Sequence, residues 1–135
     1  MNGRSLPRSL DLRGQNGQTM TEFALVLPLL VMLLFGIIQF GIAFNNYIAL
    51  TDAVRAGARK GAVARHLSDP VAAVETQVAA AATDLKAGDL DVTVESTWEH
   101  GEDVTVTATY PYSISLLGVV VKSGDLQSKA TERVE

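Results

Sequence analysis

Residues 23–44, FALVLPLLVMLLFGIIQFGIAF, contain no charged side chain, and 15 of these 22 residues are Leu, Ile, Val or Phe. A helix of 22 residues is roughly 33 Å long, which is enough to cross the hydrocarbon core of a bilayer. The alternative is a buried core helix, but the rest of a 135-residue chain is too short to cover a helix that is apolar on every side. The run therefore predicts a transmembrane segment.

The segment differs from a cleaved secretory signal, which has a shorter apolar region followed closely by a small-residue cleavage site. The nearest Ala-x-Ala pattern, at residues 62–64, lies far beyond the end of the run. We therefore expect the run to remain as a single-pass anchor. Basic residues stand on both sides of it, so charge alone leaves its orientation open. They are Arg4, Arg8 and Arg13 before the run, and Arg55, Arg59, Lys60 and Arg65 after it.

The overall composition excludes several classes of protein. Apolar residues make up 47% of the chain and charged residues 19%, which excludes a disordered chain. There is no cysteine, so disulfides and thiolate metal sites are excluded. The net charge of −4 argues against a nucleic-acid partner, which requires a basic surface. Residues 66–135 carry 12 acidic and four basic residues, which predicts a solvated acidic module.

A carboxylate stands just before the apolar run, in the sequence GQTMTEF of residues 17–23. Because a charge beside the bilayer core is costly, Glu22 is expected to have a partner. If the chain were cut after Gly17, the new amine of Gln18 would lie four residues from Glu22, and the two charges could pair on one helix face. The alternative is a glutamate in the first helical turn, favoured by the helix dipole. The spacing alone leaves both interpretations open.

The segment from Gly17 to Phe23, followed by a long apolar helix, resembles the processing site of type IV prepilins. The longer stretch through AVRAGAR at residues 53–59 is similar to TadE-like proteins, which are pseudopilins of the Flp, or tight-adherence (Tad), pilus systems. The resemblance covers residues 13–65. One departure is Gln39, which stands where many members of this family have an acid.

The resemblance implies that a prepilin peptidase, an aspartyl protease of the cytoplasmic membrane, removes residues 1–17. Gly17 and Gln18 would then flank the cut, and Glu22 and Phe23 would begin the mature helix. The implied partners are the membrane, the peptidase, other Tad pilins and pilus-assembly proteins. The implied location is the cytoplasmic membrane with the C-terminal domain outside the cytoplasm, and the sequence leaves open whether the protein enters the filament.

The helical pattern continues past the apolar run to residue 65. Small residues recur at every fourth position in this part of the helix, which makes a flat stripe that another backbone could approach closely. They are Ala49, Ala53, Gly57 and Gly61. We expect the chain's own domain to take part of this stripe and a partner to take the rest. The sequence thus predicts three regions: a leader (1–17), a helix (18–65) and an extracytoplasmic domain (66–135).

A second helix is expected to begin at Asp69 and Pro70, which suit the N-cap and the first helical position. Its apolar face is predicted from residues at helical spacing, namely Val71, Val74, Val78, Ala82 and Leu85. Lys86 is placed in its last turn, and Gly88 is expected to end it.

Alternating apolar and polar residues then predict two half-buried strands, over residues 90–98 and 104–110. The strands are joined by a hairpin loop at 99–102, and Pro111 is expected to end the second strand. The form of the apolar stretch 114–121 is left open, and a third strand is expected over 126–134. The predicted fold class is α+β, with a long N-terminal helix, a second helix and an antiparallel sheet of about three strands.

No arrangement of residues in the sequence points to catalysis, a cofactor or a metal. His66 and His100 stand apart from other ligands, and the acidic clusters lack the loop spacing of a calcium site. We therefore expect a subunit for pilus assembly and no enzyme. The alternative is an unprocessed single-span anchor that displays a small binding module at the cell envelope, and loss of the leader distinguishes the two.

Overall fold

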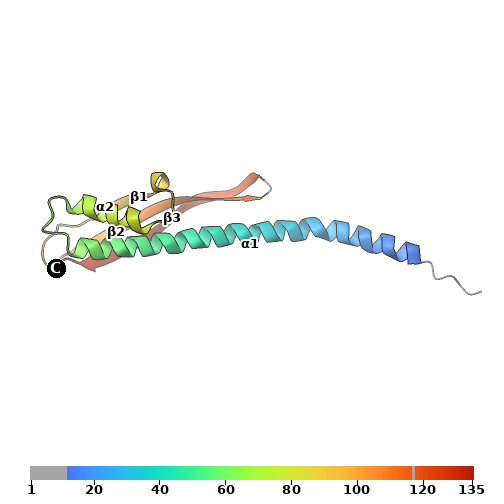
Figure 1. The fold of residues 1–135 in the computed structure, drawn as a ribbon, viewed down its shortest axis with the longest axis horizontal. Helices are drawn as coiled ribbons and strands as arrows, with labels where there is room; N and C mark the ends of the chain where they lie inside the picture. The colour runs from blue at the N-terminus through green and yellow to red at the C-terminus, as the bar shows by residue number, and fades with distance from the viewer. Residues whose placement is uncertain (1–11, 117) are drawn as a thin grey trace, which may run out of the picture. The chain divides into compact units, whose positions relative to one another are not determined.

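The computed structural model describes residues 12–116 and 118–135, and the side chains from residue 17 onward (Figure 1). Two helices, a short 3-10 helix and three strands follow in this order: α1 (Leu12–Ala62), α2 (Pro70–Ala81), η1 (Ala87–Asp89), β1 (Asp91–Glu95), β2 (Asp103–Leu116) and β3 (Val119–Arg133). The sheet is an antiparallel meander in the order β1-β2-β3. The predicted α+β class is confirmed.

The chain divides into two compact units, and the boundary falls between Phe35 and Gly36, inside α1. In the first unit, the side chains from Gly17 to Phe35 are exposed on nearly every side of the helix. Among the described residues, one helix is long and apolar enough to cross a membrane, and its most apolar window has no buried residue. This finding supports the predicted span by length and composition.

The core of the second unit lies between the helices and one face of the sheet. Its fully buried larger side chains are Leu50 and Val54 of α1, Val74 and Val78 of α2, Val104 and Val106 of β2, and Val134. Each such side chain stabilises the fold by about 1.5–3 kcal/mol relative to an exposed position. Along β2 every second residue from 104 to 110 is buried, so the predicted alternation is confirmed there.

The C-terminal half of α1 runs antiparallel to β2. A Cβ built on Gly61 would lie 2.8 Å from Val104 Cγ2, and one built on Gly57 would overlap Val78 Cγ2 and lie 3.6 Å from Val106 Cγ1. Further along, Ser128 of β3 donates a hydrogen bond to Thr51 at 3.2 Å. Only glycine permits these approaches, because a side chain at position 57 or 61 would occupy space that valines fill.

The stripe of small residues is therefore used by the chain's own domain. Ala53, Gly57 and Gly61 are buried against it, and Ala49 is partly buried on the same core. The expectation that a partner packs on the rest of the stripe stays a prediction, and the chain's own domain takes these three positions. The reason is that the valines of α2 and β2 need the space that these small residues leave.

Helix α2 begins as predicted and ends earlier than predicted. Asp69 Oδ1 accepts a hydrogen bond from the Ala72 N–H at 2.9 Å, and Pro70 opens the helix. The helix ends at Ala81, so the predictions that Lys86 lies in its last turn and that Gly88 ends it are wrong. A turn buries Ala82 and Leu85 instead, so these side chains reach the core without another helical turn. The prediction that Val71 belongs to the buried apolar face of this helix is also wrong, because its side chain is 36% exposed.

The sheet extends beyond its predicted limits. Strand β2 continues through Pro111 to Leu116, so the prediction that Pro111 ends it is wrong. Since β1 pairs no further than Thr109, β2 has only β3 beside it at Pro111, and a proline is tolerated where one edge is open. Strand β3 includes most of the predicted third strand but starts at Val119. The described residues of the open stretch 114–121 therefore belong mainly to the end of β2 and the start of β3.

The first strand, in contrast, is shorter than predicted and ends at Glu95. Ser96 Oγ donates to the Asp103 carbonyl at 3.2 Å and accepts from the Trp98 N–H at 3.1 Å. Trp98 has a φ of 58°, which directs its half-buried ring toward the core. These local bonds divert the chain out of β1 before residue 98.

Candidate functional site

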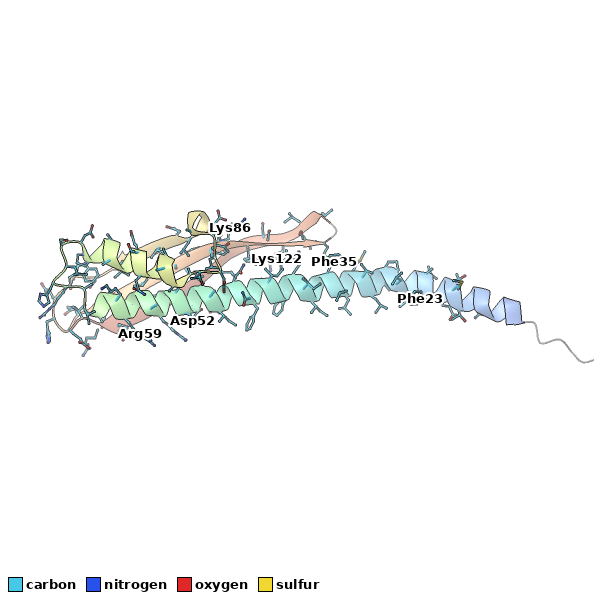
Figure 2. All side chains as sticks on the ribbon, viewed as in Figure 1. Phe23, Phe35, Asp52, Arg59, Lys86 and Lys122 are labelled. Atoms are coloured by element: carbon cyan, nitrogen blue, oxygen red, sulfur yellow. The ribbon has the colours of Figure 1, made fainter. Side chains whose placement is uncertain are left out.

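The predicted processing site, Gly17 and Gln18, and the predicted pairing residues, Glu22 and Phe23, lie in the N-terminal part of α1. Figure 2 labels Phe23 there. Glu22 Oε1 accepts a hydrogen bond from Gln18 Nε2 at 3.0 Å. Thr21 Oγ1 donates to the Gly17 carbonyl at 2.9 Å. Phe23 is 60% exposed and projects from the helix. The helical spacing thus places position 18 and the Glu22 carboxylate within hydrogen-bonding distance in the full-length chain.

The peptide bond between Gly17 and Gln18 is part of the helical backbone, since α1 begins at Leu12. No atom lies within 4 Å of a Cβ built on Gly17. Glycine is about 1 kcal/mol less favourable than alanine inside a helix, so the helix is locally weakened at this bond. The chain's own fold therefore gives no packing reason for glycine at position 17. Most of the predicted leader, residues 1–11, lies outside the described residues.

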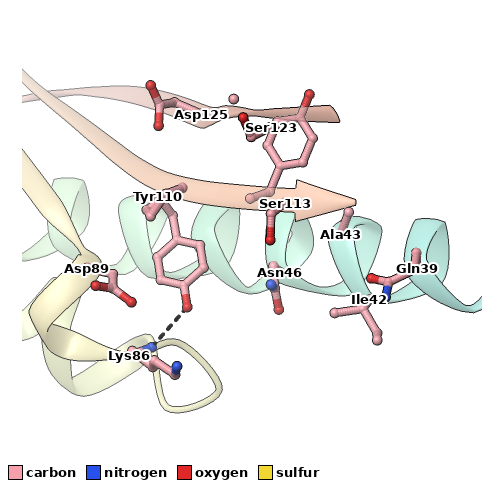
Figure 3. A pocket seen from close by; sticks show the side chains of 13 residues that line it. Gln39, Ile42, Ala43, Asn46, Lys86, Asp89, Tyr110, Ser113, Ser123 and Asp125 are labelled. Carbon is pink, nitrogen blue, oxygen red and sulfur yellow. Dashed lines mark hydrogen bonds between the residues drawn. The ribbon is translucent and has the colours of Figure 1, made fainter. Parts of the chain in front are cut away.

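A second polar site lies in the unit from Gly36 onward, as a cleft of about 700 Å³ (Figure 3). Gln39 and Asn46 of α1 line one wall, and Lys86, Asp89 and Asp125 are among the charged residues around it. The Lys86 backbone N–H donates to the Tyr110 hydroxyl at 3.3 Å, which ties the loop after α2 to β2. The cleft was missed from the sequence, because its walls come from four segments that carry no common motif.

Gln39 has a partner in the hairpin. Its Nε2 donates to Ser115 Oγ of β2 at 3.4 Å. Gln39 lies inside the uncharged run of residues 23–44, yet this contact and the polar cleft surround it with hydrogen-bonding groups. Gln39 therefore has a hydrogen-bonding partner from its own domain, although it lies inside the uncharged run.

The acidic and histidine side chains form no metal-binding group within residues 12–116 and 118–135, where no three of them come together. His66 Nε2 accepts a hydrogen bond from Arg65 Nε at 2.9 Å. His66 and His100 are both exposed.

The start of the apolar helix is also where comparison with known proteins finds a match. Residues 17–59 match the family model for TadE-like protein. The resemblance predicted from the sequence is thereby confirmed over these residues. The TadE-like segment begins at the glycine of the predicted cut and ends at Arg59, near the end of α1. It covers about a third of the chain, and the sheet lies beyond it.

No curated protein and no solved structure matches the chain. The similarity to TadE-like proteins therefore lies in the long helix of this chain.

Proposed function

We propose that this chain is a minor pilin (pseudopilin) needed for assembly of a Flp/Tad type IV pilus and processed by a prepilin peptidase. The observation that carries the proposal is the TadE-like match from Gly17 to Arg59. It starts at the proposed cut and includes the whole uncharged run. We divide the chain into a leader (1–17), a helix with the membrane span (18–65) and an extracytoplasmic domain (66–135).

In this proposal the apolar helix has two roles, in anchoring and in assembly. It first anchors the subunit in the cytoplasmic membrane, because nearly all of the large apolar side chains from Phe23 to Phe35 are exposed. It then packs against the helices of other Tad pilins or pilus-assembly proteins. The protein is a substrate of the peptidase and catalyses no reaction itself, so it requires no cofactor.

Cleavage would convert the Gln18–Glu22 contact into a charge pair. The cut releases the Gln18 α-amine, which is four residues before Glu22 on the same helix face. The uncut chain already holds the Gln18 side chain 3.0 Å from Glu22, so the carboxylate is in reach of the first residue of the mature chain. Pairing would neutralise both charges at the membrane surface, where a lone charge is costly.

The proposal predicts a mature chain that begins at Gln18, and the test is intact-mass analysis and N-terminal sequencing of protein from membranes. Gly17→Val should leave the longer form, because a branched side chain beside the scissile bond obstructs a tight protease site. The matched control is Gly41→Val, the same change at another helical glycine with no atom within 4 Å of the added Cβ. The control should be cleaved normally. A wild-type chain that keeps Met1 or Asn2 would reject processing and favour the unprocessed anchor.

A second prediction concerns orientation. Prepilin leaders are cut on the cytoplasmic side, so the domain that follows the span should face away from the cytoplasm. A reporter that is active only outside the cytoplasm, fused after the exposed Glu135, should be active. A reporter that is active only inside the cytoplasm should be silent at the same position. The opposite result would reverse the topology and remove the pilin proposal with it.

A further inference from the structure

The tip of the β2–β3 hairpin is an apolar surface on an otherwise acidic domain. Val119, Val120 and Val121 are 67%, 60% and 62% exposed. The turn at Gly118 has a φ of 84° and joins them to the apolar end of β2 at Ile114–Leu116. Covering three adjacent exposed valines is favourable, so this tip is a candidate contact surface.

The alignment of α1 with β2 places the tip along the helix. Gly61 lies opposite Val104 and Gln39 opposite Ser115. From Gly61 to Gln39 the helix advances 22 residues, or about 33 Å. From Val104 to Ser115 the strand advances 11 residues, or about 36 Å, so the two elements cover similar lengths between these contacts. Leu116, which pairs with Val119, lies one residue beyond Ser115, about 3 Å further along the strand. The tip therefore lies beyond the level of Gln39, toward Gly36, inside the uncharged run.

The polar groups next to the tip limit how deeply it can enter a bilayer. The cleft next to the tip is lined by polar side chains, such as those of Gln39, Asn46 and Lys86, which would be costly to bury in hydrocarbon. Beyond Thr109 the outer edge of β2 has no neighbouring strand, and an unpaired strand edge is not tolerated in the hydrocarbon core. A depth of 5–10 Å at the boundary between headgroups and acyl chains satisfies both conditions, because only the tip is then covered.

We infer that the tip of the β2–β3 hairpin, formed by Leu116, Val119, Val120 and Val121, inserts into the headgroup region of the bilayer that holds α1. The inference rests on the membrane anchoring in the proposed function and adds a second contact with the membrane. Lys122 follows the tip and is exposed (Figure 2). Its ammonium is therefore available to lipid phosphates, while its aliphatic stem can cover apolar surface. The outer edge of the hydrocarbon core then lies near Gln39, and residues 40–44 belong to the interface.

Because the chain contains no cysteine, a single introduced cysteine can be labelled at one known position. Full-length Val120→Cys, carrying an environment-sensitive fluorophore, is reconstituted in vesicles of phosphatidylethanolamine and phosphatidylglycerol. A second vesicle preparation contains lipids with bromine on shallow acyl carbons, which quench only fluorophores at that depth. Thr131→Cys, exposed on the same strand at the far end of the hairpin, is the matched control for the label itself. Leu30→Cys, in the apolar run, reports the span.

We expect the label at 120 to emit at shorter wavelength than the label at 131 and to be quenched by the shallow bromines, while the label at 131 is unaffected. If 120 behaves like 131 while the label at 30 is shielded from aqueous iodide, the span holds and the inference about the tip is wrong. That result would leave a neighbouring protein subunit as the partner of the tip. If the label at 30 is also open to iodide, the membrane anchoring itself fails.

Discussion

Gly57→Val should unfold much of the α/β unit, with a loss of about 3 kcal/mol or more of its stability. Overpacking a core costs typically 1–3 kcal/mol, occasionally more. A Cβ added at Gly57 already overlaps Val78 Cγ2. The same Cβ lies 3.5 Å from Val74 Cγ1 and 3.6 Å from Val106 Cγ1. Valine adds two further carbons in the same confined space. A small domain has only about 5–15 kcal/mol in total, so the effect is large.

The measurement is denaturant unfolding in detergent, followed through the fluorescence of Trp98, which is the only tryptophan and packs against the core. Gly41→Val is the matched control, because the same change on the same helix meets no atom within 4 Å. The control should leave the midpoint nearly unchanged. Equal midpoints for the two variants would show that the contact between α1 and α2 is looser than the structure describes.

A double-mutant cycle checks the cause. Gly57→Ala introduces only the overlapping Cβ, and Val78→Ala removes the methyl groups that it meets. If the overlap is the reason for destabilisation, the double variant should be more stable than the sum of the two single changes predicts. Additive effects would assign the destabilisation to something other than this contact.

Glu22→Ala should abolish piliation while leaving a stable, correctly cleaved protein. The change removes a costly charge at the membrane edge, so insertion should be unharmed or slightly improved. It also removes the proposed partner of the Gln18 amine, or of the amine of a neighbouring subunit. An unpaired ammonium in an apolar bundle of helices costs several kcal/mol, which is enough to prevent docking.

The assay combines a count of pili with a blot for protein level and size. Thr21→Ala is the matched control, because it removes a neighbouring exposed side chain whose described bond is to the Gly17 carbonyl. The control should support normal piliation. Normal pili with Glu22→Ala would reject the pairing role, and disappearance of the protein would indicate a role in stability instead.

The features that the sequence predicted correctly depend on neighbouring residues. The apolar run indicates a long helix by its length, Asp69 and Pro70 mark the start of α2, and the alternation around Val104 and Val106 marks a half-buried strand. Each of these signals is complete within a few residues. The TadE-like resemblance was likewise visible in one continuous segment.

The features that it missed depend on contacts between distant residues. The end of α2 is set by the burial of Ala82 and Leu85, and the passage of β2 through Pro111 depends on where β1 ends. The Gln39–Ser115 bond joins residues 76 positions apart, and nothing in the local sequence indicates it. The small stripe could be recognised from spacing, but which surface covers it depends on the valines of other elements.

The antiparallel alignment of α1 with β2 also has a mechanical consequence. A pull along the axis of the part of the helix from Gly36 onward is parallel to the strand. The contacts at Gly61, Gly57, Thr51 and Gln39 would then be loaded together in shear, and none of them could be peeled away before the others. Survival under load is governed by the rate of unfolding, which shear across many contacts keeps low. The same contacts would yield one after another to a force directed across the sheet.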